Sequence, residues 1–472
     1  MPSPVPSLAR PRPRPFATPV PPPGDDASRR RTGRPRLLAA LFFAAYATLS
    51  VSKHLRLRST GYDLGIFEQA VRAYAELRVP VSELKGAGYN LLGDHFHPIL
   101  ATLAPFYRLF PTPLTLLTAQ AALIALSVIP VTRLAIRTTT PRLGTAIGIA
   151  YGLSWGLQSA VGFDFHEIAF AVPLLAFCLE NLALRRWRAA AAWALPLVLV
   201  KEDLPLTVAA VGLYILLSGR RRLGTAVLAY GILSGLLIVL VVIPAFNPDG
   251  HYAYLHSASE AAGNPLTRLF LPPQKLGTLV ALLAPTAFLA LRSPLVLLAL
   301  PTLAWRFWST TPAYWGLEYH YSAVLMPVVF VAFAQALGRL HRRRLVGLAV
   351  AVSVTVSLLA LPFLPLRELT AAWRPSPWVG AAREVMSVVP DGAHVGAANF
   401  LAPQLTARAH VYQFPEVLDS GTKPEWLLIS DPARGGLPDF PWERSRVPEI
   451  PAHGYRLVVE RSGIQLYRLA DR

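Results

Sequence analysis

The sequence predicts an all-α protein that crosses a membrane many times and carries a small soluble α/β domain at its C-terminal end. Of the 472 residues, 53% are hydrophobic and 15% are charged, whereas soluble domains carry about 25% charged residues. The apolar residues gather in runs long enough to cross a bilayer as a helix, which takes about 20 residues. From residue 366 onward the apolar runs shorten to strand length, so the end of the chain belongs to a different structural class.

The first 35 residues predict a disordered cytoplasmic tail. They are rich in proline, arginine and serine, as in Arg10-Pro11-Arg12 and Pro21-Pro22-Pro23, and such a composition cannot form a packed core. The first apolar run, at about 37–53, is not followed by a small-residue cleavage site. It is therefore expected to stay in the protein as the first span rather than to be removed as part of a signal peptide.

The membrane domain is expected at residues 36–365, with about eleven transmembrane helices. After the first span, the apolar runs lie at about 113–136, 143–161, 167–184, 189–201, 204–218, 223–245, 276–291, 294–308, 321–338 and 345–365. Some of these runs are near the lower length limit for a span. Several contain proline, which neighbouring helices tolerate because they satisfy the freed backbone groups.

The distribution of Lys and Arg orients the spans, because positively charged loops stay on the cytoplasmic side. With the N-terminus inside, the inner loops receive the clusters Arg185–Arg188, Arg220–Arg222 and Arg342–Arg344. The outer connections are then 54–112, 162–166, 201–203, 246–275 and 309–320, and the C-terminus is extracytoplasmic. The net charge of +18 is divided among loops and leaves no stripe that could follow phosphates, which argues against nucleic acid as a partner.

Two further units are expected on the outer side. The outer loop 54–112 predicts an amphipathic helix at the membrane interface over residues 64–77, with the apolar positions Leu64, Phe67, Val71, Tyr74 and Leu77. Residues 366–472 form the predicted extracytoplasmic α/β domain. Its strand-length runs lie at 395–397, 410–414, 426–429, 455–459 and 464–467, and Pro, Gly and Asp between them are typical of turns. This pattern leaves the strand topology open.

Five polar clusters fall at the outer ends of the spans and predict a single site. Charged groups at membrane depth are costly and are usually functional. The clusters are Asp63; Asp94, His95 and His97; Asp164, His166 and Glu167; Lys201, Glu202 and Asp203; and Glu318 with His320. Because all five lie on one side of the membrane, they are expected to converge on the outer face.

The residue types in the first loop allow several roles. Asp63 precedes the helix expected at 64–77, so it is either an N-cap or a catalytic carboxylate. His95 and His97 alternate and point to one face of an extended segment. Together with Asp94 they could bind a divalent metal, contact a phosphate or orient Asp63, and the plain alternative is a polar turn. The requirement for a metal therefore stays open.

The cluster at 201–203 lies between two short spans, where three successive charges need partners or water. Lys201 is a candidate phosphate ligand, and Glu202 or Asp203 is a candidate partner for it. The alternative is a charged hairpin solvated at the surface.

Several of these segments resemble a family of bacterial membrane proteins catalogued as domain of unknown function 2079. The resembling segments are Tyr62-Asp63-Leu64-Gly65, Asp94-His95-Phe96-His97-Pro98, Phe163-Asp164-Phe165-His166-Glu167, Val200-Lys201-Glu202-Asp203-Leu204, Ala397-Ala398-Asn399 and Val411-Tyr412-Gln413-Phe414-Pro415. The resemblance covers nearly the whole chain after the tail. It implies a multi-pass protein of a bacterial plasma membrane.

The architecture is also similar to the GT-C superfamily of membrane glycosyltransferases. This resemblance implies transfer of a sugar from a polyprenyl-phosphate donor to a cell-envelope acceptor on the outer face, with Asp63 activating or orienting the acceptor. The substrate-binding residues would be His95, His97, His166, Glu167, Lys201, Glu202, Asp203 and His320. One departure is that Asp63 stands in its motif without an adjacent second acid.

Two other functions fit the same sequence. A transporter or flippase for lipids or small molecules would line its path with the polar clusters, although transporter sites usually lie near the bilayer midplane between repeated halves, and no internal repeat of the spans is visible. A non-catalytic membrane assembly protein with an external domain is the other alternative.

Overall fold

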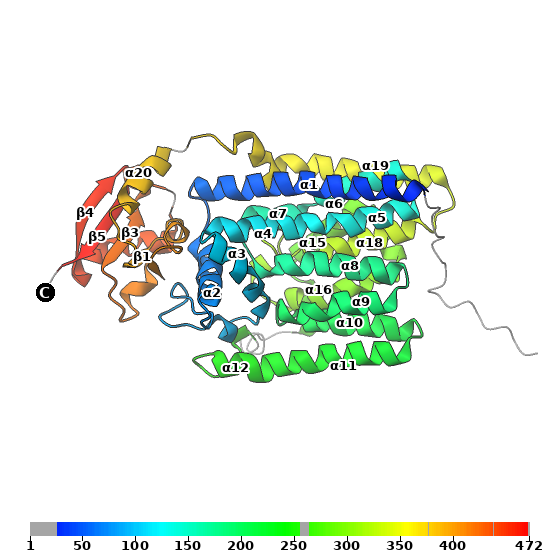
Figure 1. The fold of residues 1–472 in the computed structure, drawn as a ribbon, viewed down its shortest axis with the longest axis horizontal. Helices are drawn as coiled ribbons and strands as arrows, with labels where there is room; N and C mark the ends of the chain where they lie inside the picture. The colour runs from blue at the N-terminus through cyan, green and yellow to red at the C-terminus, as the bar shows by residue number, and fades with distance from the viewer. Residues whose placement is uncertain (1–25, 255–263, 376, 438, 471–472) are drawn as a thin grey trace, which may run out of the picture.

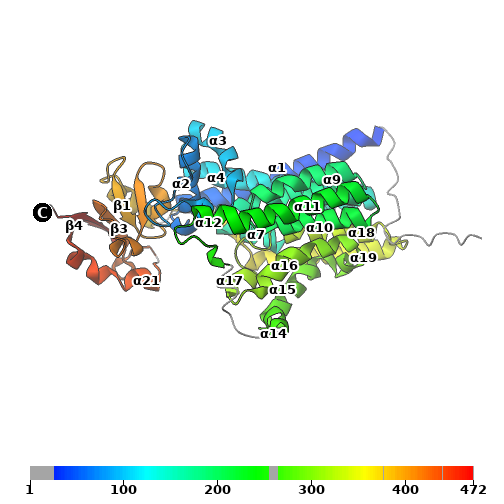
Figure 2. The same ribbon diagram turned by 90° about the horizontal axis from the view of Figure 1, so that it is seen from below.

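The computed structural model describes residues 26–254, 264–375, 377–437 and 439–470. Figures 1 and 2 show a bundle of helices lying side by side, a small sheet beyond one end of the bundle, and α2 and α3 between the two. Most of the predicted tail, residues 1–25, lies outside the described residues. Residues 26–35 already belong to α1, so the expectation of disorder is wrong for this part of the predicted tail.

Most of the bundle helices follow one another along the chain with short connections, and longer segments separate α1 from α4 and α12 from α15. The bundle consists of α1 (Asp26–Leu55), α4 (Pro113–Leu126), α5 (Val128–Thr138), α6 (Pro141–Gly152), α7 (Trp155–Phe163), α8 (Ala171–Ala183), α9 (Trp187–Ala194), α10 (Leu204–Leu217), α11 (Arg221–Leu237), α12 (Ile243–Phe246), α15 (Gln274–Leu283), α16 (Leu300–Trp308), α18 (Leu325–Leu337) and α19 (Arg343–Ala360). The remaining α-helices are α2 (Ile66–Ala75), α3 (Ala104–Leu109), α14 (Pro265–Phe270), α17 (Pro312–Trp315), α20 (Pro377–Met386) and α21 (Pro441–Arg444).

The centre of the bundle is α18, in which every residue except Gln335 is buried. A helix that is apolar all round has to be enclosed by other elements, and α5 and α8 pack against it. The helix α11, by contrast, exposes Leu233, Leu236 and Leu237, as expected for a helix that faces lipid.

The apolar helices agree with a membrane protein, while the number of spans stays a prediction. Within the described residues, four stretches are long and apolar enough to cross a membrane: Gly33–Leu55, Pro113–Thr138, Arg221–Phe246 and Arg343–Phe363. Four shorter apolar helices are Trp187–Leu199, Leu204–Leu217, Pro294–Trp308 and Leu325–Leu337. The eleven expected spans and their orientation are therefore neither confirmed nor contradicted.

Two expected spans are interrupted. The span expected at 276–291 breaks after α15, because Pro285 cannot continue an α-helix and Ala287 and Phe288 take positive φ angles of 48° and 58°. The span expected at 143–161 is divided between α6 and α7, which are separated by Leu153 and Ser154.

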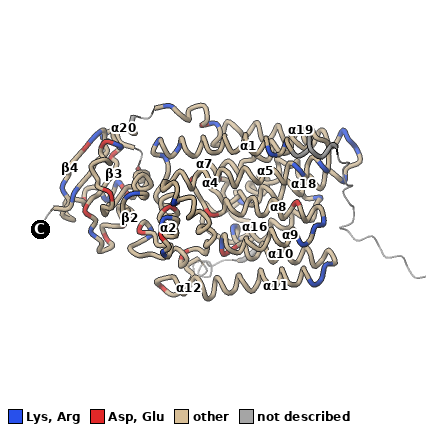
Figure 3. Tube along the Cα trace, viewed as in Figure 1, with Lys and Arg blue, Asp and Glu red and all other residues tan. Residues whose placement is uncertain are grey.

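Basic residues gather at the end of the bundle that lies away from the sheet. Figure 3 shows Lys and Arg near the turns at the far ends of α9, α11 and α19. These turns contain the clusters Arg185–Arg188, Arg220–Arg222 and Arg342–Arg344. The gathering of three separate clusters at one end is the arrangement that the positive-inside rule requires.

The helix expected at 64–77 forms, but its apolar face does not lie on lipid. Leu64, Phe67 and Val71 are buried in one cluster with Leu100, Leu103 and Tyr107. The chain after α2 folds back over the helix and covers these three residues, whereas Leu77, beyond the end of the helix, stays 85% exposed. The prediction of an amphipathic helix is correct, and the prediction of its environment is wrong for Leu64, Phe67 and Val71.

The C-terminal unit is a five-stranded mixed sheet in the order β2-β1-β3-β5-β4. Its strands are β1 (His394–Ala397), β2 (His410–Gln413), β3 (Trp426–Ser430), β4 (Tyr455–Arg461) and β5 (Ile464–Leu469). β1 pairs in parallel with β2 and β3, whereas β5 pairs antiparallel with β3 and β4. The strand-length runs of the sequence thus correspond to strands, and the boundaries of the predicted domains stay predictions.

Close packing of the bundle depends on glycines of α6 at four-residue spacing. A Cβ atom on Gly144 would lie 2.3 Å from the backbone nitrogen of Ile136, and one on Gly148 would lie 2.1 Å from Thr132 Oγ1. Small residues at this spacing let membrane helices approach closely. They bring α6 against α5, next to the central helix α18.

We expect Gly144→Ala to destabilise the protein by about 1–3 kcal/mol, because backbone rather than a flexible side chain has to move. Gly347 is the matched control, since it lies in α19 and a Cβ atom added to it would have no neighbouring atom within 4 Å. Thermal unfolding in nanodiscs should show a lower Tm for Gly144→Ala and no loss for Gly347→Ala. Equal Tm values for the two variants would contradict the packing argument.

Candidate functional site

The loops at the sheet-side end of the bundle bring most of the predicted site residues together. Asp63 lies in the π-helical turn η1 (Gly61–Gly65), directly before α2. His166 precedes the 3-10 turn η4 (Glu167–Phe170), and Lys201 follows η5 (Leu195–Leu199). His320 lies in the connection between α17 and α18.

One chain of contacts runs from Asp63 to Lys201. His166 Nε2 lies 3.8 Å from Asp63 Oδ1, and His166 Nδ1 lies 2.5 Å from Glu167 Oε2. Lys201 Nζ donates a hydrogen bond of 2.8 Å to Glu167 Oε1. Glu167 is fully buried, while the side chain of Asp63 is 22% exposed. Asp63 is therefore the most exposed end of this chain of contacts.

A second network joins the first loop to Glu202. His95 Nδ1 lies 2.6 Å from Glu202 Oε1, and the backbone amide of Phe96 donates to Glu202 Oε2 at 3.1 Å. The hydroxyl of Tyr252 donates to Glu202 Oε1 at 2.8 Å. Glu202 thus holds the loop that carries His95. Lys201 belongs to the first network and Glu202 to the second, so these two neighbouring residues connect the networks.

The imidazoles of His166 and His320 stack with their ring centroids 3.4 Å apart. His320 is 4% exposed, and neither of its ring nitrogens has a hydrogen-bond partner among the described residues. Asp203 is in a similar position, because Trp305 donates to its Oδ2 at 2.8 Å while its Oδ1 has no partner in the same part of the chain. Buried polar atoms are rarely left without partners, so these atoms mark where a ligand could bind.

Two carboxylates of the site, Asp63 and Glu202, differ strongly in pKa. Burial, together with the charges of Asp164 and Glu167, raises the pKa of Asp63 to about 7. Burial would also raise the pKa of Glu202, but His95 and Lys201 outweigh it and lower the value to about 2. Glu202 therefore stays ionised, whereas Asp63 gains and loses a proton near neutral pH. Burial also raises the pKa of Asp203, to about 6, so Asp63 is the site carboxylate with the pKa closer to 7.

The residues considered for a metal do not converge. Asp94 Oδ2 lies 3.0 Å from Lys85 Nζ, and His95 contacts Glu202. The ring of His97 packs against the ring of Phe67, with their centroids 5.6 Å apart. Burial lowers the pKa of His97 to about 4, so this imidazole is neutral. Among the described residues, no group of three or more His, Cys, Asp or Glu could hold a metal ion. The side chains at 94–97 thus have separate structural partners.

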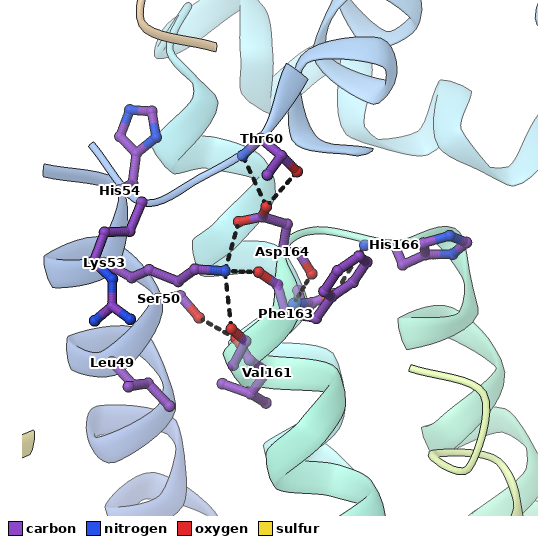
Figure 4. A network of polar contacts seen from close by, with 12 residues as sticks. Leu49, Ser50, Lys53, His54, Thr60, Val161, Phe163, Asp164 and His166 are labelled. Atoms are coloured by element: carbon purple, nitrogen blue, oxygen red, sulfur yellow. Dashed lines mark hydrogen bonds and ion pairs between the residues drawn. The ribbon is translucent and has the colours of Figure 1, made fainter. Parts of the chain in front are cut away.

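The segment before Asp63 is held from the bundle side by Lys53 and Asp164 (Figure 4). The ammonium of Lys53 donates to the carbonyls of Gly162, at 2.9 Å, and of Phe163, and lies 3.3 Å from Asp164 Oδ1. Asp164 Oδ2 accepts from the amide and the hydroxyl of Thr60 at 2.9 and 2.8 Å. This clamp joins the end of α1, the end of α7 and the start of the Asp63 turn.

The same turn is held from the other side by Asn399 of the sheet unit. The carbonyl of Asn399 accepts from the Gly61 amide at 2.7 Å, and its Oδ1 accepts from the Tyr62 amide at 3.0 Å. A Cβ atom on Gly61 would lie 2.9 Å from the Cβ of Ala402, so only glycine permits this approach. The sheet unit thus positions the backbone on which Asp63 is carried.

Sequence reasoning did not single out Lys53, Tyr252 or Gln120 as site residues. The side chain of Gln120 donates to the Asp164 carbonyl at 2.7 Å and accepts from the His166 amide at 2.9 Å. A lysine at the predicted outer end of the first span, against the general distribution of positive charge, was a usable signal for Lys53. A glutamine inside the apolar run 113–136 was a similar signal for Gln120.

Comparisons with known proteins support both the family and the fold. A family model described as "Predicted membrane protein (DUF2079)" matches residues 53–463. The crystal structure of ArnT from Cupriavidus metallidurans bound to undecaprenyl phosphate has a TM-score of 0.55 and 16% identity, covering 91% of this chain and 98% of that chain. ArnT in the apo state has a TM-score of 0.51 and 15% identity over the same shares. At these identities the likeness shows a shared fold. No curated protein sequence matches the chain.

We expect Asn399→Ala to loosen the Asp63 turn, because it leaves the Tyr62 amide without its acceptor, at a cost of about 1–3 kcal/mol. Hydrogen exchange at residues 60–66 should then be at least about fivefold faster, while exchange in the sheet stays unchanged. Asp391→Ala is the control in the same unit, since the Asp391 side chain is 82% exposed. Unchanged exchange at 60–66 in Asn399→Ala would show that the turn is held without Asn399.

Proposed function

Because this chain belongs to the DUF2079 family of predicted membrane proteins and has the fold of ArnT, we propose that it is a GT-C-like glycosyltransferase. It would transfer a sugar from a polyprenyl-phosphate donor to a cell-envelope acceptor on the outer face of a bacterial plasma membrane. The ArnT structure with bound undecaprenyl phosphate supports a polyprenyl phosphate as ligand of this fold. The predicted topology, with eleven spans and the sheet unit outside, supports the location.

The observation that carries the proposal is the state of Asp63. A general base works best when its pKa is close to the working pH, and the pKa of Asp63 is raised to about 7. Its side chain is the partly exposed end of a chain of otherwise buried polar groups. A carboxylate that served only as a helix cap would require neither a raised pKa nor partial exposure.

In the proposed reaction, the acceptor hydroxyl attacks the anomeric carbon of the sugar and transfers its proton to Asp63. The new bond joins the acceptor oxygen to that carbon, and the bond between the carbon and the phosphate oxygen breaks. The electron pair of the broken bond leaves with the polyprenyl phosphate. The base and the leaving group have to lie on opposite sides of the sugar.

The leaving phosphate needs hydrogen-bond donors and positive charge. Lys201 uses one N–H for Glu167, and an ammonium group has three, so a phosphate can share it with Glu167. His320 offers a ring nitrogen that has no partner within the described residues. His166, His97 and the Glu202–His95 pair would keep these donors in place rather than contact the phosphate themselves.

We expect Asp63→Asn to lower sugar transfer by a factor of about 10² to 10⁴, the usual contribution of a general base. The assay measures release of polyprenyl phosphate from radiolabelled polyprenyl-phosphate sugars, with purified protein and cell-envelope extract as the acceptor source. Asp94→Asn is the matched control, because Asp94 contacts Lys85 and is not the proposed base. Full activity of Asp63→Asn would remove the main support for the proposal.

The rate should rise with pH up to about 7 and then level off, since the base has to be ionised and its pKa is raised to about 7. Asp164→Asn removes a negative charge that raises this pKa, so it should shift the profile to lower pH. A profile that falls with pH, or that does not shift in Asp164→Asn, would contradict the assignment of the base.

The transporter alternative is distinguished with the same donors in sealed proteoliposomes. We expect labelled sugar to appear on the acceptor, and polyprenyl phosphate to appear as product. Movement of the intact donor across the bilayer without transfer of the sugar would favour a flippase.

A further inference from the structure

The outer surface around the end of α2 and α3 carries apolar side chains that the bundle does not cover. Leu77 is 85%, Leu109 is 72% and Phe110 is 66% exposed, and Phe106 is also exposed. These residues lie in the first outer loop rather than in an apolar stretch long enough to cross the membrane. A large apolar patch on a part of the protein outside the spans marks an interaction surface.

A hollow of about 440 Å³ lies next to this patch and is basic. Its lining includes Tyr74, Leu77, Arg78 and Arg108, and among the described residues no carboxylate belongs to it. Arg78 forms an ion pair with Glu76, which is shared with Arg72, and Arg108 donates to the Ala75 carbonyl. The lining of the hollow thus carries the two guanidinium groups of Arg78 and Arg108, which leaves positive charge for an anionic ligand.

The position of the patch in the fold indicates what covers it. Phe110 precedes the apolar stretch Pro113–Thr138, which is long enough to cross a membrane, by three residues. In Figures 1 and 2, α3 lies level with the sheet-side end of the bundle, and Figure 2 shows it near one edge of the molecule. Aromatic and apolar side chains at that level lie among the lipid headgroups.

We propose that the patch formed by Leu77, Phe106, Leu109 and Phe110 inserts into the outer leaflet, and that Arg78 and Arg108 bind the phosphate of an anionic phospholipid. Guanidinium groups are suited to phosphate because of their planar donor geometry. The site is separate from the proposed active site, since α2 separates Arg78 from Asp63 by about 15 Å of helix. The lipid would anchor the far end of the helix whose near end carries Asp63.

Insertion is tested with a spin label at Leu109→Cys in a Cys178→Ala background, in nanodiscs. Cys178 is the only cysteine of the sequence. Leu233→Cys on α11 is the reference for lipid, and Leu457→Cys on β4 is the reference for water. We expect oxygen to relax the spin label at position 109 more strongly than a water-soluble nickel chelate does, as at position 233. Water-like values, as at Leu457, or shielding from both reagents by another protein would overturn the proposal.

The phosphate site is tested with phosphatidylglycerol and native mass spectrometry of the full chain. Each arginine near an anionic lipid surface contributes about fivefold in affinity, so Arg78→Ala and Arg108→Ala should each weaken binding about fivefold. Arg78→Ala is the safer variant for folding, because its side chain is 61% exposed and its loss leaves no buried partner. Arg434→Ala in the sheet unit is the matched control. Unchanged retention of phosphatidylglycerol in a folded Arg78→Ala variant would overturn the lipid site.

Discussion

The sheet-side end of the bundle depends on the compensation of buried charge, above all in the pair of Glu167 and Lys201. Both side chains are almost inaccessible, and an isolated ion at such a position would cost several kcal/mol. The chain segments after α7 and η5 therefore have to stay together. Once they do, His166 and Glu202, which are neighbours of the pair in sequence, are brought to the same place, and the remaining polar loops assemble around them.

The buried carboxylates of the site are compensated to different degrees, and their pKa values differ as a result. The carboxylate of Glu202 is hydrogen-bonded to a histidine, a backbone amide and a tyrosine hydroxyl, which together keep it ionised. Within the described part of the chain, the polar partner given for Asp63 is the distant Nε2 of His166, at 3.8 Å. Burial and the charges of Asp164 and Glu167 outweigh Lys53 and Lys201 and raise its pKa. Two carboxylates at one site thus differ in pKa because Glu202 has close partners and Asp63 has a distant one.

The turn that carries Asp63 is fixed by both halves of the molecule. Lys53 and Asp164 hold Thr60 from the bundle, and Asn399 holds Gly61 and Tyr62 from the sheet unit. The contact continues along α2, where Gln69 donates to the Val411 carbonyl at 2.8 Å. The small sheet therefore helps to position the site residues. The lipid-binding surface proposed at the far end of α2 would stabilise the same helix.

The sequence by itself determined the class of the protein, the segments that become helices or strands, and the polar clusters that meet. It could do so because apolar periodicity and the cost of charge in a membrane are local properties of the chain. Only the tertiary structure decided that α2 buries its apolar face in the protein, that Glu167 rather than Glu202 pairs with Lys201, and that residues 94–97 have separate partners. These outcomes depend on contacts between segments up to hundreds of residues apart, such as Gly61 with Asn399, and no local pattern specifies which buried charge finds which partner.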